Sequence, residues 1–326
     1  MILAGDIGGT KTNVALFELE ETGKPLAQRS FPSGKYDSLD SIVAEFIAEH
    51  QPQLTHACFG IAGPVKDGQV KTPNLKWVVD GQKLAQTLKL ERVGLINDLE
   101  ATAYGIDSLG DAQLHALNEG KAEGGAHRAL IAAGTGLGMA GLFYDGKHYR
   151  PLASEGGHMD FAPRSPLEHD LLNYMKEKLG GGHVSYERVL SGPGLFNIYS
   201  FLRDTKAAEE PDWLAEQIKS GDGSAAVSIA GLGGKSELAV KALDHFAQIY
   251  GAMAGNLALL LKATGGLYVG GGIAPKLIEK LKDGTFIKAF NDKGRMSALV
   301  SNIPVRVILD DKTALYGAAR RAVEHV

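Results

Sequence analysis

The sequence is poor in several features that each point to a class of protein. It has one cysteine, Cys58, which excludes an intrachain disulfide and a zinc site built from several cysteines. No apolar run approaches the roughly 18 residues of a membrane-spanning helix, and the first residues lack the pattern of a signal peptide. We therefore expect a cytoplasmic protein that does not enter a membrane.

A surplus of positive charge is also missing. The 326 residues include 34 Lys and Arg against 38 Asp and Glu, which gives a formal net charge of −4. Nucleic-acid-binding proteins usually carry a basic stripe, and no run of Lys or Arg here is long enough to form one. These counts argue against a nucleic-acid partner. The length predicts about two domains, since a domain averages roughly 150 residues.

Glycine, in contrast, is abundant, with 42 residues where an average frequency of about 7 % would give roughly half that number. The glycines follow no three-residue period and hydrophobic residues make up 44 % of the chain, so neither collagen nor a disordered chain is indicated. Glycine permits tight turns and close approach of the backbone to a ligand. We therefore expect local roles for many of these residues.

Hydrophobic periodicity predicts an α/β order of elements in two passes. In the first pass we expect strands at 2–6, 12–19, 57–61 and 93–96, a helix capped by Ser38, a hairpin at Asp67-Gly68 and a helix at 99–104. In the second we expect strands on both sides of 134–138, helices through most of 166–264, a strand at 266–269, a helix after Pro275, a strand at 305–309 and a last helix. A glycine turn between two strands thus occurs once in each pass, which suggests two related halves.

The first glycine turn, at 5–10, is followed by residues that are typical of a strand. A Walker or Rossmann site would continue into a helix, so these glycines are predicted to form the tip of a hairpin. Backbone N–H groups at such a tip can bind phosphate, Thr10 can add a hydroxyl donor, and Asp6 can position Mg²⁺ through water. The alternative is an ordinary tight hairpin with a surface Asp.

The second glycine turn, Gly134-Thr135-Gly136-Leu137-Gly138, repeats this pattern. Two such turns could hold a triphosphate from both sides. The run Gly270-Gly271-Gly272, at the end of a predicted strand, would let a flat adenosine pass close to the backbone. A cluster of packing or turn glycines explains that run equally well.

The pair Asn97-Asp98 closes a strongly apolar strand. Ligands of open α/β sheets usually bind at the carboxyl ends of strands. A carboxylate there can accept the proton of a substrate hydroxyl as that hydroxyl attacks phosphorus. The alternative role for Asp98 is an N-cap of the following helix, and the two roles are compatible.

The segment Glu155-Gly156-Gly157-His158-Met159-Asp160 places ionisable groups around two glycines. Carboxylates accept hydrogen bonds from pairs of hydroxyls, and imidazole can donate or accept, so the segment suits a polyhydroxylated ligand. A metal site is the competing interpretation. Glu187 is a further candidate acceptor, although a surface Glu paired with Arg188 explains it as well.

Six segments in this order carry a family resemblance: GDIGGTKTN, LINDLEATAYG, AAGTGLGMA, EGGHMDFAP, ERVLSGPGL and GGLYVGGGIAPK. Together they resemble a bacterial glucokinase of the sugar-kinase, Hsp70 and actin superfamily. The resemblance implies an α/β, two-domain actin-like ATPase fold, related to ribonuclease H, with an interdomain cleft. It implies a small domain at 1–107 plus 305–326 and a large domain at 108–304.

The resemblance also implies transfer of the γ-phosphoryl group of Mg-ATP to the C6 hydroxyl of D-glucose, by a homodimeric enzyme. Asp98 would be the catalytic base, and the sugar hydroxyls would be bound by Asn97, Asp98, Glu155, His158 and Glu187. ATP would be bound by Gly5, Asp6, Ile7, Gly8, Gly9, Thr10, Gly134, Thr135, Gly136, Gly271 and Gly272, with Asp6 holding Mg²⁺ through water. Many related ROK proteins have a cysteine-rich zinc motif, which a chain with one cysteine cannot form, so no zinc is expected. The alternatives are a kinase for another hexose or amino sugar and a non-catalytic sugar sensor.

Overall fold

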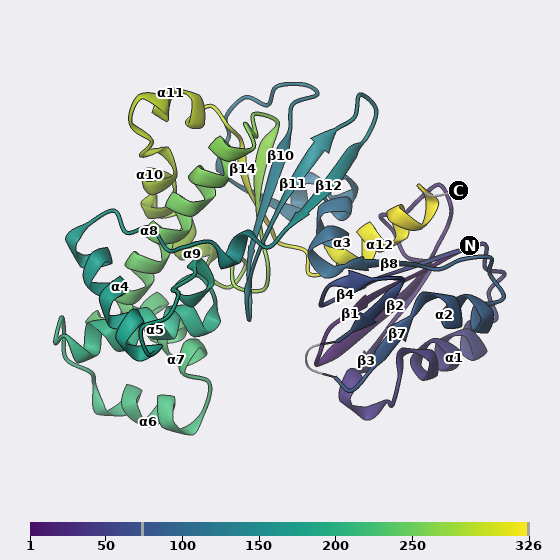
Figure 1. The fold of residues 1–326 in the computed structure, drawn as a ribbon, viewed down its shortest axis with the longest axis horizontal. Coiled ribbons are helices and arrows are strands. Elements are labelled where there is room, and N and C mark those ends of the chain that lie inside the picture. The colour runs from purple at the N-terminus through teal and green to yellow at the C-terminus, as the bar shows by residue number, and fades with distance from the viewer. Residues whose placement is uncertain (73–74, 325–326) are drawn as a thin grey trace. The chain divides into compact units, whose positions relative to one another are not determined.

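A computed structural model describes residues 1–72 and 75–324 (Figure 1). The chain divides into two compact units. The first contains Met1–Gln113, Tyr149–Ala153 and Asp310–Val326, and the second contains Leu114–His148 and Ser154–Leu309.

The first unit is built on a five-stranded sheet with strand order β3-β2-β1-β4-β8. Its main elements are β1 (Ile2–Ile7), β2 (Lys11–Phe17), β3 (Ala27–Pro32), α1 (Leu39–His50), β4 (His56–Ile61), β5 (Val65–Lys66), β6 (Gln69–Lys71), β7 (Val78–Asp80), α2 (Gly81–Leu88), β8 (Gly94–Asn97), α3 (Asp98–Gly105) and α12 (Thr313–Val323). Strands β1, β4 and β8 run parallel, and β2 is antiparallel to both β1 and β3. The carboxyl ends of β1, β4 and β8 therefore meet at one edge of the sheet.

Successive side chains of a strand point to opposite faces of the sheet, and both faces of this sheet are buried. Leu3 and Ile7 of β1 pack with α1 and α2, whereas Ile2 and Ala4 pack with α12. Helix α1 begins at its N-cap Ser38, whose hydroxyl accepts a hydrogen bond from the Ser41 N–H. At edge strand β3, Arg29 forms ion pairs with Glu45 and Glu49 of α1 at 2.8 and 3.0 Å. The sheet thus lies between two helical layers.

Helices α3 and α12 lie side by side (Figure 1). They approach each other so closely that only glycine fits at two positions. A Cβ on Gly317 would lie 1.7 Å from the carbonyl oxygen of Ala101, and one on Gly105 would lie 1.9 Å from the carbonyl oxygen of Thr313. Backbone thus packs directly on backbone, and the carboxyl-terminal helix is held against the helix that begins at Asp98.

The second unit combines a sheet with a large group of helices. The six-stranded sheet has the order β12-β11-β10-β13-β14-β9. The strands of this sheet and the helices of the unit are β9 (Leu114–Asn118), β10 (Arg128–Ala133), β11 (Leu137–Tyr144), β12 (Tyr149–Ser154), α4 (Pro166–Lys178), α5 (Gly192–Asp204), α6 (Asp212–Ser220), α7 (Gly223–Leu232), α8 (Glu237–Leu260), β13 (Gly266–Gly270), α9 (Ile278–Leu281), α10 (Thr285–Asn291), α11 (Ser297–Val300) and β14 (Val305–Ile308). Strand β12 pairs in this sheet although Tyr149–Ala153 are counted with the first unit.

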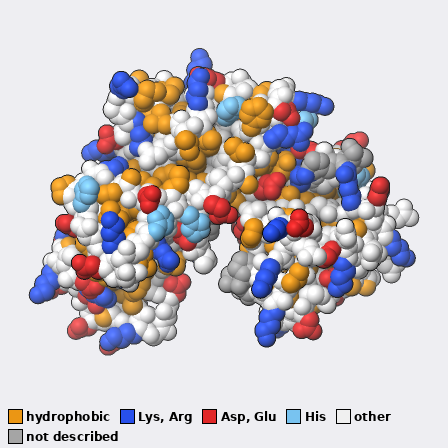
Figure 2. Space-filling model, in the orientation of Figure 1, with side chains coloured by type: hydrophobic (Ala, Val, Ile, Leu, Met, Phe, Trp, Pro, Cys, Tyr) orange, Lys and Arg blue, Asp and Glu red, His pale blue; other side chains and the backbone are white. Residues whose placement is uncertain are grey.

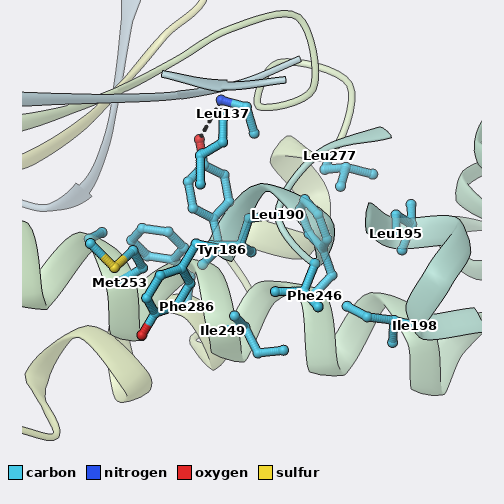
Figure 3. Packing of buried hydrophobic residues seen from close by; sticks show 14 of the residues in the cluster. Leu137, Tyr186, Leu190, Leu195, Ile198, Phe246, Ile249, Met253, Leu277 and Phe286 are labelled. Carbon is cyan, nitrogen blue, oxygen red and sulfur yellow. Dashed lines mark hydrogen bonds between the residues drawn. The ribbon is translucent and has the colours of Figure 1, made fainter. Parts of the chain in front are cut away.

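The core of the second unit surrounds the 24-residue helix α8. Phe246, Ile249 and Met253 of this helix lie in one buried cluster with Tyr186 and Leu190 (Figure 3). The Tyr250 hydroxyl, also on α8, accepts a hydrogen bond from the Ala133 N–H at 3.2 Å. The helix therefore supports the end of β10, where the second glycine turn begins.

Most predicted elements are confirmed, including the hairpin at Asp67-Gly68, whose two residues both have positive φ, and the cap at Ser38. Two expectations were wrong. Pro275 does not begin a helix, because turns follow β13 and α9 starts at Ile278. The strand at 305–308, which the resemblance placed in the small domain with 1–107, pairs with β13 and β9 in the second sheet. The chain re-enters the first unit at Asp310.

Three further features concern the single cysteine, the charged surface and the length of the apolar helices. Cys58 is fully buried, and burial raises the pKa of its thiol to about 12, as expected of a core residue. Basic and acidic side chains are interspersed on the face shown in Figure 2. Among the helices of residues 1–72 and 75–324, none is long and apolar enough to cross a membrane.

The contact between α3 and α12 can be tested with Gly317→Ala. We expect it to lower the free energy of unfolding by at least about 2 kcal/mol, because the added methyl group separates the two helices. The control is Gly34→Ala, since a Cβ there meets nothing within 4 Å. Urea unfolding measures both, and an unchanged midpoint for Gly317→Ala would contradict the proposed packing.

Candidate active site

The first glycine turn is the tip of a hairpin, as predicted, with β1 ending at Ile7 and β2 beginning at Lys11. The Gly8 N–H donates to the Lys11 carbonyl at 3.0 Å. Ser33 supports the tip from the side, because its hydroxyl donates to the Gly8 carbonyl at 2.8 Å and lies 2.9 Å from the Thr12 hydroxyl. Thr10 is exposed. Ser33 thus holds the tip on one side, while Thr10 at the tip is exposed to solvent.

Asp6 lies at the end of β1 in an electrostatically unfavourable position. Burial raises the pKa of its carboxyl to about 6; a hydrogen bond from Asn13 opposes this shift, and the charges of Asp98 and Asp311 add to it. The Asn13 side chain is itself fixed by the Ser30 hydroxyl at 2.6 Å. Two further carboxylates of the first unit, those of Asp98 and Asp311, therefore act on Asp6 near this turn.

Asn97 and Asp98 stand at the carboxyl end of β8, where α3 begins. Asn97 is the N-cap: its side-chain oxygen accepts from the Leu99 N–H at 2.9 Å, and its amide donates to the Gly63 carbonyl at 3.0 Å. Asp98 is the first helical residue, and its Oδ1 also accepts from the Leu99 N–H at 2.9 Å. Burial raises the pKa of Asp98, and the bond from the Leu99 N–H partly opposes this.

The second glycine turn joins β10 to β11 in the second unit, again as a hairpin. The Gly134 N–H donates to the Gly136 carbonyl, and the Gly192 N–H donates to the Gly134 carbonyl, both at 2.8 Å. Glu187 reaches this turn, because its Oε2 accepts from the Leu137 N–H at 3.0 Å. A Cβ at Gly136 would lie 2.6 Å from the same oxygen. The turn and Glu187 are therefore neighbours.

The segment 155–160 packs beside this turn. A Cβ at Gly157 would lie 2.0 Å from the Leu137 carbonyl oxygen, so only glycine allows this approach. Glu155 and His158 are exposed. His183 holds the segment, because its Nε2 lies 2.8 Å from the His158 carbonyl and its Nδ1 lies 2.8 Å from Asp160. The second unit thus brings Gly134–Gly138, Glu155, His158 and Glu187 together.

Gly271 and Gly272 follow β13 and adjoin the same turn. Gly271 has φ of 82°, and a Cβ on it would lie 2.3 Å from the Ala133 carbonyl oxygen. The Ile273 N–H donates to that oxygen at 3.2 Å. Gly272 has open space around it. The end of β13 is therefore fixed against the end of β10, with one glycine constrained and the next one free.

The acidic residues near the first turn fit a divalent cation. Burial, and to a smaller extent the charges of Asp98 and Asp311, raise the pKa of Asp6, and a cation beside this carboxylate would stabilise its charged form. Mg²⁺ keeps several waters, so one or two carboxylates suffice. Within the described residues, no group of three or more His, Cys, Asp or Glu is arranged as a metal-ligand cluster.

Four further residues of the site were not identified from the sequence: Asn13, Ser33, His183 and Asp311. Asp311 carries a signal that could have been used, since it follows an apolar strand as Asp98 does. Ser33 and His183 act through contacts between segments that lie apart in the sequence, so no local pattern marks them. Asn13 lies opposite Asp6 across the predicted hairpin, so the register of that hairpin could have indicated it.

A model of the glucokinase family matches residues 3–325. The chain belongs to the glucokinase family. The glucokinase of Synechocystis sp. is 44 % identical over 341 residues, covering 97 % of this chain and 96 % of the relative. The glucokinase of Nostoc sp. is 42 % identical over 334 residues, covering 98 % of both chains. The resemblance inferred from six motifs is thereby confirmed.

Solved glucokinase structures share the fold. A glucokinase from an Antarctic psychrotroph superimposes with a TM-score of 0.86 at 30 % identity, over 99 % of this chain and 98 % of the other. The glucokinase of Balamuthia mandrillaris, determined in complex with glucose, gives 0.79 at 24 % identity, over 98 % and 93 %. The predicted α/β glucokinase fold is confirmed; the predicted cleft between domains and the individual site residues stay predictions.

Substitutions at the two neighbouring glycines after β13 test the constrained turn. We expect Gly271→Ala to weaken ATP binding at least tenfold and to lower thermal stability, because it combines a strained φ with a backbone clash. Gly272→Ala, where a methyl group meets open space, is expected to change stability little. Calorimetric titration with ATP measures the affinity, and thermal unfolding measures the stability. Equal affinity and equal stability of the two variants would contradict the constraint that we assign to Gly271.

Removal of the Asp6 charge tests the electrostatic account. In the unfolded chain this carboxyl ionises near pH 4, whereas in the folded chain it ionises near pH 6, so stability falls as pH rises between these values. Above pH 6 we expect Asp6→Asn to have a free energy of unfolding up to about 3 kcal/mol higher than the unsubstituted protein, and a higher melting temperature. Near pH 4 the two should be equally stable. Thermal scans in EDTA measure this. A difference that does not change with pH would refute the account.

Proposed function

We propose that the chain phosphorylates D-glucose at the C6 hydroxyl with ATP as donor, giving glucose 6-phosphate and ADP. The observation that carries this proposal is the match of the glucokinase family over residues 3–325, supported by relatives more than 40 % identical along the whole chain. The site geometry supports the roles proposed below for several of the predicted residues.

In the first unit, Asp98 is the proposed catalytic base. Its carboxylate accepts the C6 hydroxyl proton while that oxygen bonds to the γ-phosphorus and the bond from phosphorus to the ADP oxygen breaks. The bond from the Leu99 N–H orients the carboxylate, and the N-terminus of α3 favours its negative charge. Asn97, anchored to the Gly63 carbonyl, is proposed to bind an adjacent sugar hydroxyl.

In the second unit, the exposed Glu155 and His158 and the half-buried Glu187 are proposed to bind further sugar hydroxyls. The turn at Gly134–Gly136 and the turn at Gly5–Thr10 are proposed to bind the phosphates from the two units, with Gly271 and Gly272 beside the adenosine. ATP and glucose would then occupy a cleft between the units, and closure on the sugar would exclude water.

Mg²⁺ is proposed to bind near Asp6 through water, where it would neutralise charge on the phosphates. Asp6 would orient the coordinated water, and Asn13 would hold the Asp6 side chain in place. A homodimeric assembly and a cytoplasmic location are further predictions from the sequence. Both can be measured independently of activity.

The role of Asp98 is tested by Asp98→Asn. We expect kcat to fall by about 10²- to 10⁴-fold with a smaller change in KM for glucose, because a general base acts mainly in the transition state. The matched control is Asp67→Asn on an exposed hairpin tip, a conformation that Asn also adopts. A coupled assay for glucose 6-phosphate measures both, and near-normal kcat in Asp98→Asn would rule out this role.

The choice of substrate is tested by comparing kcat/KM for glucose, mannose, fructose and N-acetylmannosamine. We expect glucose to be preferred. Preference for another sugar would make the chain a related hexose or amino-sugar kinase. Calorimetric binding of glucose without turnover in the presence of Mg-ATP would instead indicate a sugar sensor.

A further inference from the structure

A pocket of about 610 Å³ lies in the first unit, away from Asn97 and Asp98. It is bounded by the start of β4, the loop before β8 and the last turns of α12. Strands β4 and β8 are parallel, so their amino ends lie together at the edge of the sheet opposite the one that carries Asn97. The pocket is therefore separate from the residues proposed for catalysis.

The charged residues at this pocket are mainly cationic. Arg92 and Arg321 line it together with His56, and Glu91 is the one acidic side chain among the lining residues. Burial lowers the pKa of His56, and the neighbouring amino terminus and Arg92 lower it further. Its Nδ1 lies 2.9 Å from the Thr55 hydroxyl. The described lining thus carries two guanidinium groups against one carboxylate, and its imidazole is neutral at neutral pH.

Arg321 has unused hydrogen-bonding capacity. Its Nε is buried and has no hydrogen-bond partner in the part of the chain that the structure describes. Its guanidinium lies 5.7 Å from the centre of the Tyr104 ring. It also acts electrostatically on Glu100, although the two form no ion pair among the described residues. The adjacent Arg320, in contrast, pairs with Asp107 and Glu324 at 3.1 and 3.2 Å. Buried donors are usually satisfied, so the Arg321 guanidinium is incompletely paired within the described residues. Because Nε itself is buried, a ligand in the pocket would meet the terminal amino groups of this guanidinium.

We propose that this pocket binds a small organic phosphate monoester, with its phosphate between Arg92 and Arg321. Guanidinium groups present donors in the planar geometry that phosphate oxygens accept. The volume lies in the range of small-molecule sites and exceeds what a phosphate ion alone would fill. Apolar lining at Ala57, Val93 and Ala322 would contact the organic part. This site is additional to the proposed catalytic function and does not depend on it.

The site is tested by calorimetric titration of the full chain with glycerol 3-phosphate. Glucose and a non-hydrolysable ATP analogue are present at high concentration, so that any catalytic site is already filled. We expect binding in the millimolar range or tighter, at least tenfold weaker binding of glycerate, which lacks the phosphate, and weaker binding of inorganic phosphate. Equal affinity for glycerate or for inorganic phosphate, or absence of binding, would overturn the proposal.

Charge variants locate the site. We expect Arg321→Gln and Arg92→Gln to weaken binding at least fivefold, and Glu91→Gln to strengthen it by a factor of two or more. Lys83→Gln, an exposed change of the same charge outside the lining, should have no effect. Arg92 and Glu91 are exposed, so we expect their variants to fold. These two variants therefore still test the proposal if Arg321→Gln fails to fold.

An unchanged affinity in Arg92→Gln, or weaker binding in Glu91→Gln, would overturn the proposal. Failure of glucose and the ATP analogue to bind would count against the proposed catalytic function only. The response of glycerol 3-phosphate binding to the charge variants would still decide whether the pocket is a site.

Discussion

The first unit depends on direct backbone packing between α3 and α12. Gly105 and Gly317 leave no room for a side chain, so the carboxyl-terminal helix lies against the backbone of the helix that starts at Asp98. The carboxyl-terminal helix α12 also covers the face of the sheet formed by Ile2, Ala4 and their neighbours. A segment from the end of the chain thus completes the core around the first glycine turn, and it also places Asp311 near Asp6.

Features with a local cause were predictable from the sequence. Both glycine hairpins were recognised because strand-like residues, not helical ones, follow the glycines, and Asp67-Gly68 has the residues that a turn with two positive φ values requires. Ser38 was recognised as a helix cap by its position before an apolar face. Asp98 was placed at the end of a strand because an apolar run precedes it. The helix cap, however, is its neighbour Asn97 and not Asp98.

Features with a non-local cause were not predictable. A short apolar strand such as 305–308 carries no mark of the sheet that it joins, because its partners β13 and β9 come from distant segments. Pro275 follows a common helix-start pattern, but the chain turns there while Ile273 is held by the Ala133 carbonyl. His183 and Ser33 support the site through contacts that only the folded chain creates. The pocket at Arg321 likewise combines three separate segments.

The outermost strands of the five-stranded sheet affect how copies of the chain can associate. Exposed edges with free backbone groups invite further strands, which leads to aggregation. Strand β3 carries Arg29 in ion pairs with α1 and ends at Pro32, which has no N–H to donate, and β8 is only four residues long. Neither edge is a good template for another strand. A homodimer of this chain would therefore form through a surface other than an extension of this sheet.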